Sequence, residues 1–251
     1  MEKYILVELD PTITHNSTFG YKSREPLSKT HHREKTEAAA KQGMHCIHIF
    51  DWDDQEKIVS FFKKKISIYA RKCKIKEIED TEEYQAFINE NHFQGYCKGN
   101  KIIVGLYYND ELVEIMSFGK PRYNKKYEYE LLRLCTSMKY KVIGGASRIF
   151  EYFKNKYSPK SIISYCDMSK FSGDVYLELG FTLYRKNQPS KHWYNITTGQ
   201  HITDNLLRQR GFDQLFDADY GKGTSNEELM ISNGFLEVYD CGQATYIWKK
   251  E

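Results

Sequence analysis

The chain has 251 residues, and its 37 lysine and arginine residues nearly balance 34 acidic ones, giving a net charge of +3. That charge does not indicate nucleic-acid binding by itself, so a basic surface must come from local clusters. No apolar stretch reaches the about 18 residues that a transmembrane helix needs, and the opening MEKYILVELD lacks the apolar core of a signal peptide. We therefore expect a cytoplasmic protein of one or two domains with no membrane partner.

The first part of the chain predicts a small strand and helix unit. The expected elements, in chain order, are a buried strand at 4–9, a turn-rich segment from Pro11 to Pro26, a helix at 28–42 with Ser28 as N-cap and Gly43 as its stop, a buried strand at 44–50 and an amphipathic helix at 53–65. This piece is too short to bury a large core alone.

After a basic run at residues 71–76, the pattern becomes that of a larger domain. The expected elements are a strand at 73–78, a helix at 81–92, two strands at 101–108 and 111–119 joined at Asn109-Asp110, a strand at 127–135, a helix at 145–157, a strand at 161–166, a helix at 173–179 and a strand from Phe181. This order predicts an α/β fold around a mixed sheet. Residues 203–233 read as helices and loops, and residues 235–248 as a terminal hairpin around Cys241-Gly242.

Six cysteines stand at positions 46, 73, 97, 135, 166 and 241, and none forms a Cys-x-x-Cys pair. Several lie in apolar runs, such as Cys46 in MHCIHIF. This spacing argues against a zinc ribbon and against a disulfide framework. We expect buried, reduced thiols.

Two motifs of the larger domain resemble the GNAT acyltransferase fold. Lys141-Val-Ile-Gly144-Gly145-Ala146 opens the expected helix at 145–157, and small residues there let backbone N–H groups approach a pyrophosphate. Tyr176-Leu-Glu-Leu-Gly180-Phe181 follows. The resemblance implies an acyl-CoA donor held by Lys141, Gly144, Gly145 and Ala146, with Tyr176 as general acid. Lys141 stands where the family usually has Gln or Arg, and a tight turn and a core tyrosine are the ordinary alternatives.

A wider resemblance extends over residues 70–251. The stretches EYELLRLCTSMKYKVIGGASRIFEYF, GDVYLELGF and YDCGQATYIW are similar to the Mom family of phage DNA-modification proteins and to C-terminal domains of phage homing-endonuclease-type proteins. This implies a nucleic-acid partner inside a host cell.

Clusters of basic residues predict the same partner independently. Lys120, Arg122, Lys125 and Lys126 alternate with Tyr123 and Tyr127, so that cations meet phosphates while rings stack on bases. A solvated basic loop is the alternative. Further basic groups are Lys191-His192 beside Trp193-Tyr194, and Arg208 with Arg210. We expect DNA as the partner, contacted by Lys120, Arg122, Lys125, Lys126, Arg208 and Arg210.

The N-terminal piece resembles very-short-patch-repair-like (Vsr) endonucleases in the segments VELDPTITH, KTHHREK and IHIFDWDD. The resemblance implies Glu8 and Asp10 as Mg²⁺ ligands, and Glu8, Asp10, His15 and His32 as catalytic residues. Surface carboxylates and solvated histidines are the alternative. Only three residues precede the first strand, so this restriction-endonuclease-like βαβα piece is shorter than the family's domain.

Together these patterns predict a truncated Vsr-like piece at 1–68, a GNAT-like domain at 69–200 and a helical extension with a hairpin at 201–251. The leading hypothesis is a DNA-binding, homing-endonuclease-like protein that cleaves phosphodiesters with Mg²⁺. The alternatives are an acyltransferase that modifies a nucleobase with an acyl-CoA-type donor, and a non-enzymatic nucleic-acid-binding protein. The target sequence, the acyl donor and the oligomeric state stay open.

Overall fold

The computed structural model describes residues 4–22, 24–210 and 225–250, apart from the side chains of residues 208–210. The chain divides into two compact units that alternate along the sequence. Unit 1 contains residues 1–53, 167–172 and 186–243, and unit 2 contains residues 54–166, 173–185 and 244–251. The three domains expected from the sequence, divided at residues 68 and 200, have other boundaries than these two units and stay a prediction.

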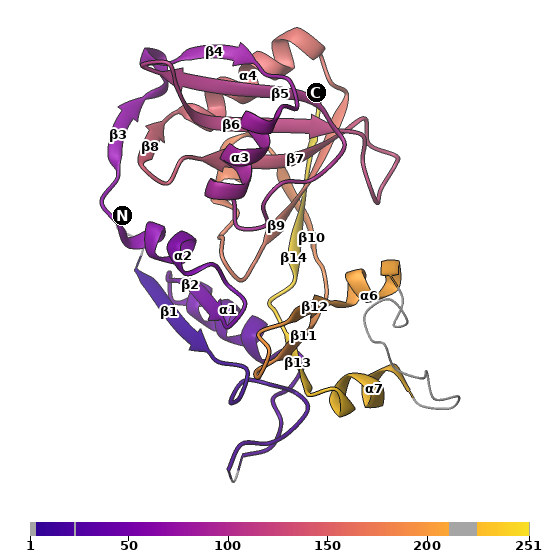
Figure 1. Cartoon of the computed structure of the whole chain (residues 1–251). Helices are drawn as coiled ribbons and strands as arrows, with labels where there is room; N and C mark the ends of the chain where they lie inside the picture. Colours follow the sequence, from indigo (N-terminus) through magenta and orange to yellow (C-terminus); the bar gives the residue numbers. More distant parts are fainter. Residues whose placement is uncertain (1–3, 23, 211–224, 251) are drawn as a thin grey trace. The chain divides into compact units, whose positions relative to one another are not determined.

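Unit 1 begins with a parallel strand pair joined through a helix (Figure 1). Strand β1 (Ile5–Asp10) pairs with β2 (His45–Phe50), and helix α1 (His31–Lys41) lies between them in sequence. The N-cap of α1 is Thr30 rather than the expected Ser28. Gly43 follows the helix with a φ of 75°, a left-handed conformation that glycine adopts without strain.

The rest of unit 1 is a three-stranded sheet with two helices. Strand β11 (Lys191–Asn195) lies between β12 (His201–Thr203) and β13 (Phe235–Tyr239) in this sheet. In the sequence, helix α6 (Asp204–Arg210) follows β12, and helix α7 (Asn226–Ser232) precedes β13. Helix α7 begins with a capping box between Ser225 and Glu228. The core of this part is formed by Trp193, Ile202, Leu207, Met230 and Phe235.

The expected terminal hairpin at 235–248 is wrong. Both strands exist, but β13 pairs with β11, whereas β14 (Gln243–Lys249) belongs to the large sheet. The turn between them is held by the Asp240 carboxylate, which accepts hydrogen bonds from the backbone N–H groups of Ser190 and Gly242. Alternating apolar residues predict a strand, but they do not specify which strand becomes its partner.

Unit 2 is built on a seven-stranded mixed sheet in the order β10-β14-β9-β7-β6-β5-β4 (Figure 1). Its remaining strands are β4 (Lys74–Glu77), β5 (Asn100–Tyr108), β6 (Glu111–Gly119), β7 (Tyr129–Thr136), β9 (Ser161–Asp167) and β10 (Thr182–Lys186). Strands β4 to β7 are antiparallel, and β7 and β9 are parallel. The expected α/β fold with a mixed sheet is confirmed.

Helices α3 (Glu82–Asn91) and α4 (Gly145–Tyr157) pack on the two faces of this sheet. Tyr84 and Ile88 of α3 share a core with Ile115 of β6, while Phe153 of α4 stacks on Phe118 of the same strand at 3.6 Å between ring centroids. Neighbouring side chains of a strand point to opposite faces, so these two contacts place the helices on opposite sides. Helices α2 (Gln55–Phe62) and α5 (Asp174–Glu178) and the 3-10 turn η1 (Ala70–Lys72) complete the unit.

One strand pair was missed by the sequence patterns. Strand β3 (Ile66–Tyr69) pairs in parallel with β8 (Tyr140–Ile143), which places Lys141 opposite Ser67. Each strand has only four residues, too few for an alternation to stand out.

The structure also describes the cysteines and the length of the apolar helices. None of the six cysteines, all within the described part, forms a disulfide, and five of them are buried. Across the described ranges, no helix is both long and apolar enough to span a membrane.

Candidate functional site

Strands β7 and β9 pair along only part of their length. Their register joins Tyr129, Glu130 and Leu131 to Ile162, Ile163 and Ser164, although β7 continues to Thr136 and β9 to Asp167. The two strands therefore diverge after Leu131. In a mixed sheet, such a divergence between parallel strands exposes backbone groups that a ligand is able to pair with.

The Tyr176 hydroxyl lies at the point of divergence. Ser164 Oγ is 2.9 Å from the Leu131 carbonyl oxygen and 3.1 Å from Tyr176 Oη. Tyr176 comes from α5, is buried, and stacks on Tyr246 of β14 at 4.7 Å. Burial raises the pKa of this phenol, so the hydroxyl keeps its proton at neutral pH.

The glycines at the start of α4 have different surroundings. Gly144 is the N-cap, with a φ of 75°, is exposed, and a Cβ added there would meet no atom within 4 Å. Gly145 is buried, and its added Cβ would stand 1.6 Å from Glu114 Oε2. The first glycine therefore leaves open backbone at the amino end of a 13-residue helix, and the second makes room for a buried carboxyl group.

Among the described residues, that carboxyl group, on β6, forms no ion pair. Glu114 is 4% exposed, and its Oε2 has no hydrogen-bond partner among the described residues. Burial raises its pKa to about 8, against a smaller opposite effect of Thr136. The raised pKa favours the protonated form of Glu114 at neutral pH, in which it adds no negative charge at the amino end of α4.

The remaining residues of the expected donor loop lie around Gly144. Lys141 is an exposed residue of β8, and Ala146 is half-buried in the first turn of α4. The four residues of the predicted loop are thus together at one helix end, as expected from their spacing in the sequence.

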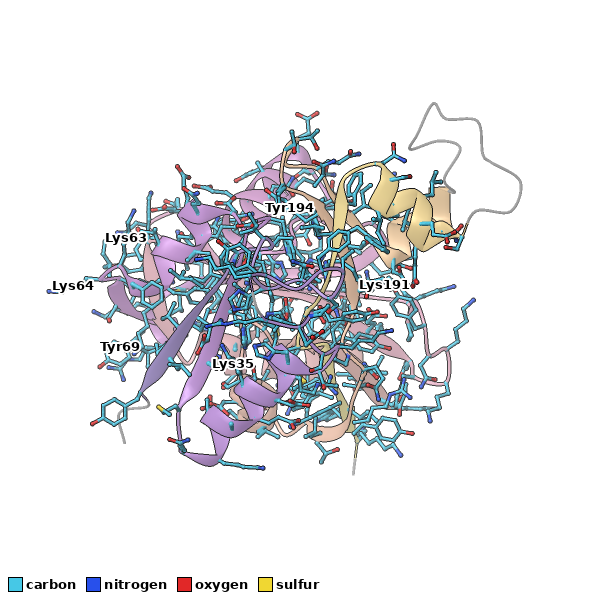
Figure 2. All side chains as sticks on the ribbon, turned by 90° about the horizontal axis from the view of Figure 1, so that it is seen from below. Lys35, Lys63, Lys64, Tyr69, Lys191 and Tyr194 are labelled. Carbon is cyan, nitrogen blue, oxygen red and sulfur yellow. The ribbon has the colours of Figure 1, made fainter. Side chains whose placement is uncertain are left out.

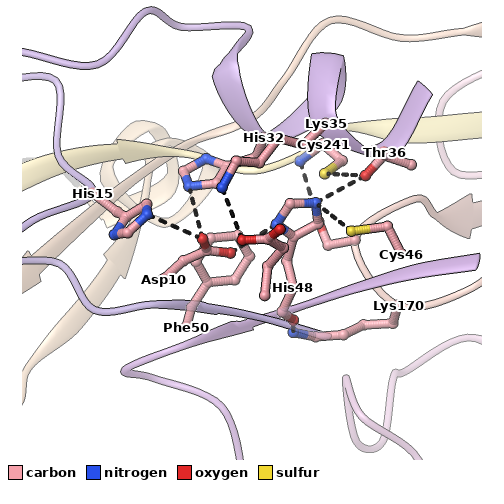
Figure 3. A network of polar contacts seen from close by, with 12 residues as sticks. Asp10, His15, His32, Lys35, Thr36, Cys46, His48, Phe50, Lys170 and Cys241 are labelled. Carbon is pink, nitrogen blue, oxygen red and sulfur yellow. Dashed lines mark hydrogen bonds and ion pairs between the residues drawn. The ribbon is translucent and has the colours of Figure 1, made fainter. Parts of the chain in front are cut away.

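A second polar cluster, in unit 1, surrounds Asp10 at the end of β1 (Figure 3). Asp10 is fully buried, and its Oδ2 accepts a hydrogen bond from His48 Nδ1 at 2.7 Å. Its Oδ1 lies 3.4 Å from His15 Nε2 and 3.8 Å from His32 Nε2. Burial raises the pKa of this carboxyl, but the His48 hydrogen bond and the neighbouring imidazoles outweigh burial and hold the pKa below its ordinary value.

The Nε2 atom of neutral His32 is a hydrogen-bond acceptor that faces Asp10. The ring's Nδ1 donates to the Tyr239 carbonyl at 2.6 Å, so Nε2 carries the lone pair in the neutral ring. Burial lowers the pKa of His32 to about 4, which keeps the ring neutral at pH 7. Within the described chain, neither His32 Nε2 nor Asp10 Oδ1 has a hydrogen-bond partner. Two buried acceptors that lie 3.8 Å apart therefore lack a donor.

His48 belongs to the cluster, although the sequence patterns did not single it out. Its Nε2 lies 2.9 Å from the Thr36 hydroxyl and 3.5 Å from Cys46 Sγ. Parallel pairing places His48 opposite Glu8, beside the end of β1. The strands at 4–9 and 44–50 were both expected, so assuming that they pair in parallel would have placed His48 near Asp10.

The expected Mg²⁺ ligands do not fit that ion. The Glu8 carboxylate is bound by Lys35 Nζ at 2.8 Å, and Asp10 is enclosed by imidazoles rather than by oxygen ligands. Over the described residues, no group of three or more His, Cys, Asp or Glu side chains is arranged to hold a metal ion. His15, with 21% of its side chain exposed, is the most accessible of the three imidazoles on Asp10.

The residues expected to contact DNA differ in their surroundings. Lys120, Lys125 and Lys126 are exposed. Arg122 instead binds the buried Glu130 carboxylate through its backbone N–H and its guanidinium, at 2.7–2.9 Å. Arg208 and Arg210 belong to the last turn of α6, and their side chains are outside the described part.

The lysines labelled in Figure 2 include ion-paired and exposed ones. In unit 1, Lys35 binds Glu8, and Lys191 lies between Glu227 and Glu237 at 2.8 and 2.9 Å. In unit 2, Lys63 and Lys64 are exposed after α2 (Figure 2).

Solved structures similar to this chain include acetyltransferases. One from Bacillus subtilis in complex with CoA is 13% identical, covering 72% of this chain and 100% of its own, with a TM-score of 0.42. A GNAT family acetyltransferase from Elizabethkingia anophelis with acetyl-CoA bound is 10% identical, covering 71% and 99%, with a TM-score of 0.35. An N-acetyltransferase from Staphylococcus aureus is 11% identical, covering 70% and 97%, with a TM-score of 0.32. No protein-family model and no curated protein matches the chain.

Proposed function

We propose that unit 2 is an acyltransferase that uses an acyl-CoA-type donor. The observation that carries this proposal is the position of Tyr176 Oη, 3.1 Å from Ser164 Oγ, where β7 and β9 diverge. Open backbone at Gly144, at the amino end of α4, supports it, because helix N-termini favour bound phosphate. Both features belong to unit 2 and fit one ligand with an anionic end and a reactive end.

The chain's own residues have three tasks in this reaction. Gly144 and the first turn of α4 bind the anionic end of the donor, with Lys141 adding positive charge. Tyr176 holds a proton at Oη, the position from which a leaving thiolate is protonated. A bound acyl-CoA donor supplies the activated acyl group as a thioester. Neutral Glu114 avoids repulsion of the phosphates.

A charge placed at Gly144 tests the donor site directly. Both Asp and Asn tolerate the left-handed backbone at this position, and they have nearly the same size. We expect Gly144→Asn to keep most of the affinity for acetyl-CoA, and Gly144→Asp to lose about tenfold or more, since repulsion between a carboxylate and a phosphate about 4 Å apart costs on the order of 1–4 kcal/mol. Calorimetry with CoA and acetyl-CoA measures both. Equal binding by the two variants, or no heat with folded parent protein, contradicts the proposal.

Tyr176→Phe separates binding from turnover. The substitution removes only the hydroxyl, so donor affinity should stay near that of the parent while acetyl transfer falls by about a hundredfold, the usual loss on removing a general acid. The acceptor is identified by mass spectrometry after incubation with nucleic acid. A variant with unchanged turnover excludes Tyr176 as the acid.

The Asp10 cluster supports a second candidate function, a DNA-binding, homing-endonuclease-like phosphodiesterase. The specific observation is the pair of buried acceptors, Asp10 Oδ1 and His32 Nε2, facing each other beside the partly exposed His15. His15 is placed to exchange a proton with a ligand while Asp10 orients it. Plasmid incubated with protein in Mg²⁺ and in EDTA tests this candidate, and because the described cluster does not fit Mg²⁺, cleavage should occur in both. Asp10→Asn and His15→Gln should abolish cleavage, and Glu34→Gln on the exposed side of α1 should not.

A further inference from the structure

We propose that a basic and aromatic surface of unit 2, here called the β6–β10 surface, binds single-stranded nucleic acid. It consists of the loop at residues 120–127, Tyr165 of β9, and Tyr184 with Arg185 of β10. This site is separate from the acyl donor site and does not depend on acyl transfer.

Ring and charge contacts join the parts of the β6–β10 surface. The Lys126 ammonium lies 5.3 Å from the centroid of Tyr127 and 5.6 Å from that of Tyr184. Tyr123 meets Tyr165 edge to face at 6.0 Å, and the Arg122 guanidinium lies 5.9 Å from the Tyr123 ring. Loop, β9 and β10 therefore form one surface, although they are far apart in sequence.

Arg122 fixes the loop rather than serving as a free phosphate contact. Three hydrogen bonds from its backbone and guanidinium hold the Glu130 carboxylate, which is fully buried at the start of β7. A buried carboxylate with three donors from one arginine gives the loop a defined position. The lysines that the loop carries are thus presented on a preorganised support.

The charge of this surface favours a polyanion. Lys120, Lys125, Lys126 and Arg185 are exposed cations, whereas the Arg122 charge is balanced by Glu130. The exposed acid next to them, Glu128, accepts a hydrogen bond from the Lys160 backbone. The surface therefore has a net positive charge, which the whole chain, at +3 among 71 charged residues, does not suggest.

Exposed aromatic faces select a single strand over a duplex. Tyr123 is 68% exposed and Tyr184 is 54% exposed, so both rings are accessible to a ligand. Ring faces beside cations bind unpaired bases by stacking, while a duplex keeps its base faces inside. Strand β10 is also at the edge of the seven-stranded sheet, and its residues Thr182–Lys186 are all exposed.

Binding of a fluorescein-labelled oligothymidylate of about 16 nucleotides to the full chain tests the proposal by fluorescence anisotropy. We expect Tyr123→Ala and Tyr184→Ala each to weaken binding by about tenfold, the loss of one stacked base. Lys125→Ala should reduce the slope of log affinity against log salt by about 0.7, the value for one phosphate contact on a single strand. The matched controls are Tyr4→Ala and Lys101→Ala, both exposed and outside the surface.

Any of the following results overturns the proposal. One is tighter binding of the corresponding duplex than of the single strand. Another is unchanged affinity in both tyrosine variants, which would show that charge alone, without base stacking, accounts for the binding. The third is the absence of binding at low salt, or binding that anionic lipid vesicles of phosphatidylserine displace as readily as a second oligonucleotide. Since none of the variants is at Gly144 or Tyr176, failure here leaves the acyltransferase proposal untouched, and the reverse holds as well.

Discussion

Two buried carboxyl groups show how neighbouring residues decide the charge of a side chain. Asp10 is surrounded by imidazoles and accepts a hydrogen bond from His48, which stabilises the carboxylate and lowers the pKa. Glu114 forms no ion pair among the described residues, and burial raises its pKa to about 8. The same degree of burial therefore produces an anion in unit 1 and a neutral acid in unit 2.

Glu114→Gln should change how stability depends on pH. Between the unfolded value of 4.5 and the folded value of about 8, the folded chain keeps the proton on Glu114 and the unfolded chain has lost it. The free energy of unfolding of the parent thus falls as pH rises through this window, by up to about 1.4 kcal/mol per pH unit, and levels off above it. Glutamine does not ionise, so the variant should lack this slope.

Urea denaturation of both proteins at several pH values from 5 to 9 measures the difference. The control is Glu111→Gln, on the same strand, where the carboxylate is exposed and hydrogen-bonded to Tyr140. That group should not contribute a falling slope in this window, because its pKa is lowered. Parallel curves for the parent and Glu114→Gln would show that Glu114 is already charged in the folded chain.

Sequence reasoning selected some of these residues and not others. Asp10, His15 and His32 were chosen from the resemblance, and the structure brings them together. His48 was missed because its role depends on the register of two strands that are 38 residues apart. Glu114 was missed because a glutamate within an apolar run gives no sign of which neighbour it will meet.

At the scale of single elements, the start of α4 depends on two glycines for separate reasons. Gly144 must adopt a left-handed backbone, while Gly145 must leave room for the Glu114 side chain. One glycine of the motif that resembles a pyrophosphate loop, Gly145, is therefore needed for packing. Of these two glycines, Gly144 is the exposed one, which is why the donor-site test is placed there.

A double-mutant cycle distinguishes these two requirements. Gly145→Ala should cost about 1–3 kcal/mol, because its methyl group overlaps the Glu114 carboxyl. Gly144→Ala should cost about 1–2 kcal/mol through backbone strain alone. In a Glu114→Ala background, the cost of Gly145→Ala should shrink while the cost of Gly144→Ala stays the same. Chemical denaturation of the six proteins gives the coupling energies, and equal coupling for both glycines would refute the assignment.

Element prediction succeeded where a signal is local. The helix at 145–157 and the strands at 111–119 and 161–166 have bounds within one residue of those expected, and Asn109-Asp110 forms the expected turn with φ values of 50° and 63°. Strand partners were harder, as the separated strands β13 and β14 illustrate. Pairing depends on contacts between distant segments, which no local pattern encodes.

At the scale of the molecule, unit 1 depends on contacts between its first and last segments. Arg33 of α1 donates hydrogen bonds to the carbonyl oxygens of Cys241 and Asn187, and Thr18 accepts one from the Glu237 backbone. Arg33→Met should remove these donors and cost about 1–3 kcal/mol, because buried carbonyls lose their partner. Lys41→Met, exposed at the end of the same helix, is the control and should change stability little. Thermal unfolding followed by circular dichroism measures both.

The same contacts predict that residues 1–68 do not fold as an isolated fragment. This piece lacks the Tyr239 carbonyl that His32 binds at 2.6 Å and the Glu237 carbonyl that Ser17 binds at 2.7 Å. Ile5, Val7 and Leu9 of β1 are exposed, so the strand pair buries little apolar surface of its own. We expect the fragment to show no cooperative unfolding transition, whereas the full chain shows one. A fragment that unfolds cooperatively in urea, with the far-ultraviolet spectrum of an α/β protein, would establish 1–68 as an independent domain instead.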